Sequence, residues 1–130
     1  MRSGGLISST ARLGLCLAVL IHWLPLPGVL GGATLRQLYG LGSLDPGMEL
    51  LLQHRALMFA LLSAPLLLAL WRRSACGGAV VLLLSSDIGF LALAALHWPL
   101  DAALQRVLLF DLASITLLLL GGAGLGRRQL

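Results

Sequence analysis

Charged side chains interrupt otherwise apolar stretches of this chain, and they are the residues most suited to chemistry. Arg55, Asp87, Arg106 and Asp111 each stand in a run of leucines, alanines and valines. A single charge at the centre of a bilayer costs about 2.5–3.5 kcal/mol, so four such groups should not face lipid. Two positive and two negative groups at similar depth can neutralise one another. We therefore expect an Arg55–Asp87–Asp111 cluster, with Arg106 nearer the outer surface.

Three further polar residues, His22, His54 and Glu49, are expected in the same outer half of the chain's membrane segments. Glu49 lies at the rim, where it could pair with Arg36 or Arg106. The expected cluster as a whole comprises Arg55, Asp87, Asp111, Arg106, His54, His22 and Glu49. Two interpretations are open: a buried ionic lock that fixes helix register, or a polar cavity for a proton, a small solute or a quinone headgroup.

The sequence offers no metal, cofactor or catalytic motif. His22, His54 and His97 stand singly on separate segments, without HxxxH or HExxH spacing. We interpret them as hydrogen-bonded or interfacial histidines and expect no haem or metal ligation. We likewise expect no cofactor and no catalytic residue, which favours a protein that is not an enzyme.

The elements that position these residues follow from composition. Apolar residues make up 58% of the 130 residues and charged residues 11%, against about 45–50% and about 25% in ordinary soluble domains. A soluble fold of this size cannot hide that much apolar surface, so the sequence predicts an integral membrane protein. The nine basic residues are all arginines and are scattered in ones and twos, which argues against nucleic-acid binding.

A transmembrane helix needs about 20 residues, and four segments are long enough. They are about 13–30, 48–70, 75–97 and 101–124. The sequence thus predicts an all-α four-helix transmembrane bundle, with residues 1–130 forming a single domain. The polar and glycine-rich segment 31–47 is expected to form a short interfacial helix, and Pro46 is expected to begin the second span.

The arginines predict the orientation of the bundle. Six of them lie beside the ends of spans that would face the cytoplasm, namely Arg2, Arg12, Arg72, Arg73, Arg127 and Arg128. Only Arg36 lies in an outer loop. The positive-inside rule therefore predicts cytoplasmic N- and C-termini. Residues 1–30 also resemble a signal peptide, and cleavage there would leave three spans, although the prolines at 25 and 27 make a poor cleavage site.

The stretch "ISSTAR", residues 7–12, resembles the ISSTxxR signature of nucleotidylyltransferases, in which serine and arginine side chains bind ATP phosphates. Here Arg12 follows Thr10 by two positions instead of three. The partner HxGH motif is absent, because His22 is followed by Trp-Leu-Pro. We therefore interpret residues 7–12 as the lead-in to the first span.

Four stretches carry a wider resemblance: "LYG" at 38–40, Asp45-Pro46, "LLQHRALMF" at 51–59 and "DAALQRVLLFDLASI" at 101–115. In these the chain resembles a family of small uncharacterised four-helix proteins of the bacterial inner membrane. Some members carry the name phosphopantetheine adenylyltransferase, which the all-membrane sequence and the missing HxGH contradict. The arrangement is also distantly similar to DoxX-like four-helix proteins, which are linked to quinone-coupled and redox complexes.

These observations lead to a multi-pass protein of the bacterial inner (plasma) membrane. The first hypothesis is a structural or accessory subunit that packs against a larger membrane complex or against copies of itself. The second is a small carrier or quinone-linked, redox-linked subunit that uses the outer polar pocket. Apart from such proteins, the lipid bilayer is the expected partner.

Overall fold

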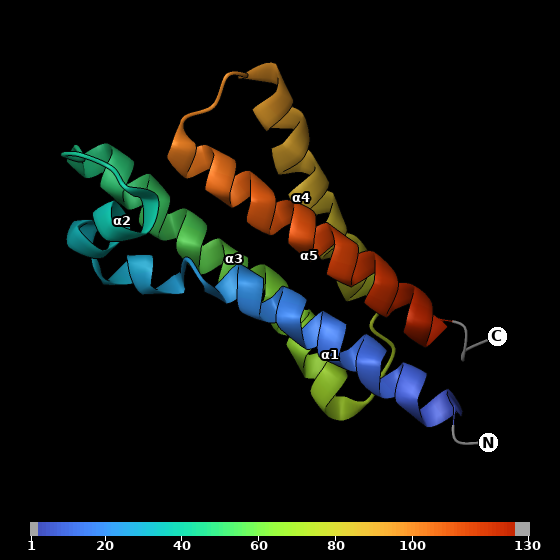
Figure 1. Ribbon diagram of the computed structural model, residues 1–130. Coiled ribbons are helices and arrows are strands. Elements are labelled where there is room, and N and C mark those ends of the chain that lie inside the picture. The colour runs from blue at the N-terminus through green and yellow to red at the C-terminus, as the bar shows by residue number, and fades with distance from the viewer. Residues whose placement is uncertain (1–2, 127–130) are drawn as a thin grey trace.

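The computed structural model describes residues 3–126 and, among their side chains, those of residues 8–125. The described chain is helical, as predicted (Figure 1). Its elements are α1 (Ser3–Trp23), the 3₁₀ turn η1 (Leu26–Leu30), α2 (Gly32–Tyr39), α3 (Pro46–Arg72), α4 (Gly77–Leu96) and α5 (Ala102–Gly126).

Four of these segments are long and apolar enough to cross a membrane: Ser8–Leu30, Pro46–Arg72, Gly77–Leu96 and Ala102–Leu125. The four-span prediction is therefore confirmed at the level of length and composition, which supports a multi-pass membrane protein. The start of α1 and the end of α5 lie together at one end of the bundle, and α2 lies at the opposite end (Figure 1). We refer to these as the terminal end and the α2 end.

Local sequence explains where most of the helices begin and end. Asp45 caps α3, because its carboxylate accepts hydrogen bonds from the backbone N–H groups of Gly47 (2.9 Å) and Met48 (3.0 Å). Pro46 occupies the first turn of α3, as predicted. Gly40 ends α2 with a left-handed conformation, φ 64°, which glycine adopts without steric cost.

The first span differs from its prediction in shape. The regular helix begins at Ser3, well before residue 13, and ends at Trp23. Pro25 and Pro27 follow, and the chain continues as the 3₁₀ turn η1, because proline can neither donate a backbone hydrogen bond nor fit inside a regular helix. The "ISSTAR" stretch lies within α1. Arg2, Arg127 and Arg128 lie outside the described residues.

The bundle is polar inside and apolar outside in the half nearer α2. The buried side chains include His22, Ser63, Asp87, Asp111 and Ser114, while many leucines are exposed. This distribution is unfavourable in water but favourable in lipid. A leucine that faces hydrocarbon has no hydrophobic cost, whereas a polar group that faces hydrocarbon is costly unless it has a partner. In the half nearer the terminal end the core is apolar and includes Leu15, Leu66, Leu83 and Leu118.

Glycines bring α1 and α5 into close contact near the terminal end. A Cβ atom placed at Gly121 would stand 2.6 Å from the Leu15 side chain and 3.0 Å from the Ala11 carbonyl oxygen. One placed at Gly124 would stand 2.8 Å from the Ala11 Cβ. Small residues are the usual means by which membrane helices approach closely. This contact anchors α5, which diverges from α2 and α3 toward the α2 end (Figure 1).

Candidate binding cavity

The centre of the site is a buried hydrogen bond between α1 and α4. His22 Nε2 lies 3.0 Å from Asp87 Oδ1, and the two residues are only 5% and 1% exposed. The other ring nitrogen, His22 Nδ1, lies 2.9 Å from the backbone carbonyl oxygen of Ala18, one turn earlier in α1. The edge of the Phe59 ring, from α3, packs against the His22 ring at 5.9 Å between centroids. Three helices therefore fix this imidazole.

The hydrogen-bond partners of this pair determine how many protons it holds. The Ala18 carbonyl can only accept, so Nδ1 must carry a hydrogen. The Nε2–Oδ1 hydrogen bond needs a second hydrogen between them, whichever atom holds it. The pair is therefore either an imidazolium beside a carboxylate or a neutral imidazole beside a protonated acid, and both forms hold one proton more than a neutral histidine beside a carboxylate.

Two more buried oxygens adjoin this part of the bundle without a hydrogen-bond partner among the described residues: Asp87 Oδ2 and Ser114 Oγ. Asp111, one turn before Ser114 on α5, is 9% exposed. It lies within electrostatic range of Asp87, Arg55 and His22. The interior thus holds two acids and two basic groups, and the net charge is zero when His22 is protonated.

Within the Arg55–Asp87–Asp111 cluster expected from the sequence, Arg55 forms no ion pair within 4 Å among the described residues. The only ion pair within 4 Å that the described residues form is His22–Asp87. The Arg55 guanidinium instead lies over two phenyl rings, 5.1 Å from the centroid of Phe59 and 4.9 Å from that of Phe90. Ring faces attract cations, so these contacts shield the charge from lipid without neutralising it. Arg55 acts on Asp111 only at longer range.

Glu49 has a different partner from those expected. Its Oε1 accepts a hydrogen bond of 2.7 Å from the backbone N–H of Gly32, at the start of α2. The carboxylate therefore caps α2 and interacts favourably with the positive end of its helix dipole. It pairs with neither Arg36 nor Arg106. His54 is exposed and stands apart from the buried groups.

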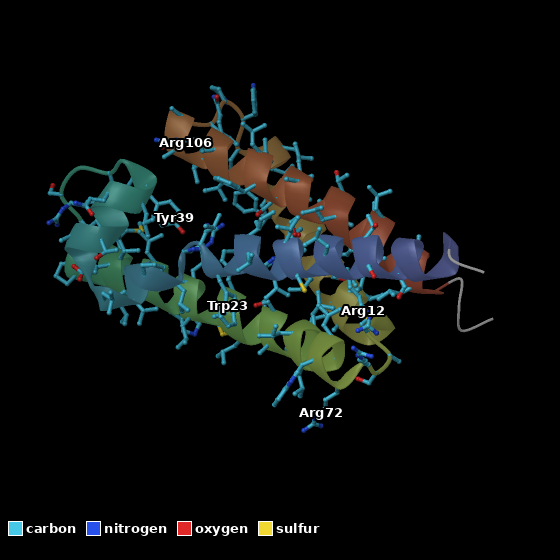
Figure 2. The ribbon with its side chains drawn as sticks, turned by 60° about the horizontal axis from the view of Figure 1, so that its bottom comes forward. Arg12, Trp23, Tyr39, Arg72 and Arg106 are labelled. Carbon is cyan, nitrogen blue, oxygen red and sulfur yellow. The ribbon has the colours of Figure 1, made fainter. Side chains whose placement is uncertain are left out.

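Arg106 lies at the α2 end of α5 and is exposed. Its guanidinium approaches the end of α2: a Cβ atom placed at Gly40 would stand 3.3 Å from Nη2. A cation at this position interacts favourably with the negative end of the α2 helix dipole. Figure 2 shows Arg106 and Tyr39 toward the α2 end and Arg12 and Arg72 toward the terminal end.

A cavity of ≈170 Å³ opens between the end of α1, with the Leu24–Pro25 link that follows it, and α5, and residues of α2 and α3 complete its lining. Apolar side chains form most of its wall, and His22, Tyr39, Arg106 and Asp111 supply the polar groups. The lining residues are Ile21, His22, Leu24, Pro25, Leu38, Tyr39, Phe59, Ala103, Arg106, Val107, Phe110 and Asp111.

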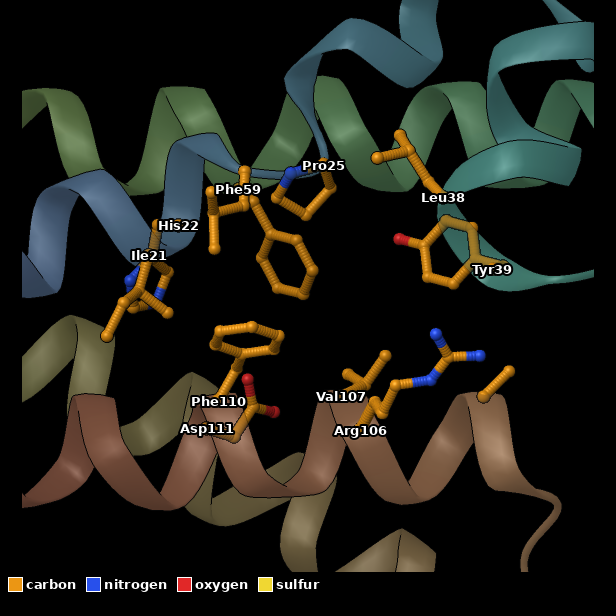
Figure 3. Close-up of a pocket in the computed structure, with 12 residues that line it drawn as sticks. Ile21, His22, Pro25, Leu38, Tyr39, Phe59, Arg106, Val107, Phe110 and Asp111 are labelled. Carbon is orange, nitrogen blue, oxygen red and sulfur yellow. The ribbon is translucent and has the colours of Figure 1, made fainter.

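The polar groups lie at two ends of this cavity (Figure 3). His22 and Asp111 lie at one end, and the Tyr39 hydroxyl points inward from the other, where Arg106 approaches it. The rings of Phe59 and Phe110 face the space between them. An apolar cavity of about 150 Å³ accommodates benzene, so this space suits one six-membered ring with a polar group at either end.

Tyr39 presents a neutral hydroxyl to the cavity. Burial raises the pKa of Tyr39, the nearby Arg55 charge opposes that rise, and the Asp111 charge adds to it. The hydroxyl therefore stays protonated at neutral pH and can donate a hydrogen bond to a bound carbonyl oxygen.

Neither a metal centre nor a disulfide is formed by the described residues. No three His, Cys, Asp or Glu side chains among residues 3–126 gather as metal ligands would. Cys16 is exposed and Cys76 is buried in the apolar core, and both are free. His97 is exposed, and its Nδ1 lies 2.8 Å from the Leu93 carbonyl oxygen, one turn earlier in α4.

Comparison of the sequence with protein-family models and with curated proteins finds no match, and comparison of the fold with solved structures finds none either. The function is therefore inferred from the residues and their geometry.

Sequence reasoning identified the polar residues but missed two features of the site. It did not place Tyr39, Phe59 and Phe110 around a cavity, and it did not pair His22 with Asp87. A signal was present: Ala18 and His22 are four residues apart, so a histidine in this helix can always bond its own backbone and leave Nε2 free for another helix.

Proposed function

We propose that this chain is a multi-pass protein of the bacterial inner membrane whose N- and C-termini lie in the cytoplasm. Arg12, Arg72 and Arg73 at the terminal end, against Arg36 alone in the segment that holds α2, support this orientation. In it, α2 lies at the outer interface. Reporter fusions at Asp45, Arg73, Pro99 and Leu130 should read outside, inside, outside and inside. Any other order, or a mature chain that lacks residues 1–30, would contradict the proposal.

Its function, we propose, is to bind a lipid-soluble molecule with a ring-shaped headgroup, of the quinone class, in the cavity between α1 and α5. The observation that carries the proposal is the arrangement of the lining: two aromatic rings in the middle, Tyr39 and Arg106 at one end, and His22 and Asp111 at the other. A para-quinone has a carbonyl group at each side of one ring. One carbonyl oxygen matches the Tyr39 and Arg106 donors at one end, and the oxygen on the opposite side of the ring meets Asp111, which accepts from a hydroxyl group when ionised and donates to a carbonyl group when protonated.

Binding to the full chain in lipid nanodiscs tests this function. Duroquinone, a single ring with methyl groups and two carbonyls, serves as the probe, and equilibrium dialysis gives its affinity. Ala103 lines the cavity, so Ala103→Phe should fill it and abolish saturable binding, whereas Ala102→Phe, at the neighbouring exposed position, should leave binding intact. Equal binding by the two variants, or no saturable binding by the natural chain, would refute the function.

A second candidate, the structural or accessory subunit, is favoured by a different observation. A shallow groove lies on the surface between α1 and α5 near the terminal end, and the half-buried Gly14 and Gly124 are among its lining residues. Small residues on a lipid-facing surface allow another transmembrane helix to approach. Purification in mild detergent, with Gly14→Leu as the variant, tests it: a stoichiometric membrane partner that this substitution removes would support it, and a monomeric natural chain would oppose it.

A further inference from the structure

We propose that His22 and Asp87 hold one buried proton at the floor of the cavity, and that Asp111 links this proton site to the ligand. The first part stands on the geometry of the pair alone. The second part rests on the proposed function, because it concerns the molecule that occupies the cavity.

The hydrogen bonds of His22 require the proton. Nδ1 donates to the Ala18 carbonyl oxygen and Nε2 shares a hydrogen with Asp87 Oδ1. Loss of that hydrogen would leave two lone pairs facing each other at 3.0 Å, between side chains that are only 4% and 1% exposed. The pair therefore keeps one proton as part of its structure.

While Asp111 is ionised, the surrounding charges favour the same proton. The charged groups that act on this place are Asp87 from α4, Asp111 from α5 and Arg55 from α3, with the neutral Tyr39 of α2 beyond them. Two carboxylates and one guanidinium leave a charge of minus one, and protonated His22 brings the total to zero. A membrane interior penalises uncompensated charge strongly, so the proton on the pair is the balancing charge.

Asp111 provides the connection to the ligand. It lines the cavity together with His22, and its carboxyl lies next to the Phe110 ring (Figure 3). An ionised carboxylate can only accept a hydrogen bond, whereas a protonated one can donate. A ligand carbonyl at this end therefore needs a proton on Asp111, and a ligand hydroxyl needs its absence. The oxidised and reduced forms of one ring should differ in the proton that accompanies their binding.

Counting the protons of His22 tests the first part without any ligand. In a His54→Gln and His97→Gln double variant, His22 is the only histidine, because the chain has three. Nitrogen NMR of the labelled ring in nanodiscs, with infrared detection of protonated carboxyl groups, should find one proton on the pair at neutral pH. It should appear either as a doubly protonated ring or as a singly protonated ring beside a protonated Asp87.

Two further variants make that measurement specific. Asp87→Asn offers Nε2 an amide donor, so the ring should become singly protonated with no new protonated acid. Asp101→Asn, which retains the cap that Asp101 provides to Leu104, should leave His22 as it is. A neutral ring beside an ionised Asp87 in the otherwise natural chain would overturn the proposal. This measurement needs no substitution near the site.

The pH dependence of binding tests the second part. Duroquinone should bind more tightly as the pH falls and duroquinol as it rises, each by up to about tenfold per pH unit while Asp111 titrates. Asp111→Asn should bind both forms without that dependence, because an amide both donates and accepts. An equal pH dependence of the two forms, or one that survives Asp111→Asn, would overturn the link. Failure of both probes to bind at every pH would refute the proposed function, while the proton count on His22 would still decide the first part.

Discussion

The hydrogen bond between His22 and Asp87 should be the strongest single polar contact between helices in this bundle. We expect His22→Leu and Asp87→Leu each to lower the free energy of unfolding, and the double variant to cost less than the sum of the two. After either single change the remaining partner is buried without its hydrogen bond: Asp87 would then have no partner on either oxygen, since Oδ2 already lacks one. In the double variant no such group remains.

Two limits set the size of the effect. Removing one partner of a buried ion pair costs about 3–5 kcal/mol in soluble proteins. Polar contacts between membrane helices average about 0.6 kcal/mol and reach about 1.7 kcal/mol, because the unfolded chain also finds partners in the membrane. His22 and Asp87 are almost fully buried, so we place each single change at about 2 kcal/mol and the coupling energy at about 1–1.5 kcal/mol, toward the upper end of the membrane range.

Unfolding of the purified chain in mixed detergent micelles, followed by circular dichroism, measures these quantities. His97→Leu is the matched control, because His97 Nδ1 makes the same bond to a carbonyl one turn earlier but has no carboxylate partner among the described residues and is exposed. It should change the free energy of unfolding by less than about 0.5 kcal/mol. A coupling energy near zero, or equal losses for His22→Leu and His97→Leu, would refute the reasoning.

The remaining predictions concern three other contacts, and all of them except the titration of Tyr39 are measured in the same unfolding assay. Gly121→Leu should destabilise the bundle by about 1–3 kcal/mol, because its side chain would overlap Leu15; no loss would mean that α1 and α5 are not in close contact. Glu49→Ala should cost about 1 kcal/mol, since it removes the cap on Gly32, and Glu49→Gln should recover part of it; equal losses would contradict the capping role. Arg55→Lys should cost about 1 kcal/mol, because the guanidinium loses its contact with two rings. Arg55→Met removes the charge and should raise the pKa of Tyr39, because the Arg55 charge lowers it. An unchanged Tyr39 titration would show that Arg55 does not act on Tyr39.

The sequence by itself determined the class of the fold. Leucine-rich segments of membrane-spanning length can only be helices in lipid, because every backbone polar group there must be satisfied within the segment. The start of α3 at Pro46 was also predicted, since proline fixes its own backbone angle and lacks an N–H group. The break after Trp23 has the same cause but was not predicted, because the first span was expected to continue to residue 30. The sequence also indicated that Asp87 and Asp111 turn inward, because a charged group in an apolar run avoids lipid, whereas Arg106 and His54, expected in the same cluster, are exposed.

Only the tertiary structure decided which of these residues meet. Helical spacing places Arg55 and Asp87 at similar depths, but the rotation of each helix about its own axis depends on the side chains packed along its whole length. In the structure the Gly121 contact places α5 against α1, and His22, Asp87 and Asp111 lie within electrostatic range of one another. Arg55 is turned toward Phe59 and Phe90 instead. The depth of a charged residue in the membrane follows from the sequence, whereas the residue that it contacts depends on how the helices pack.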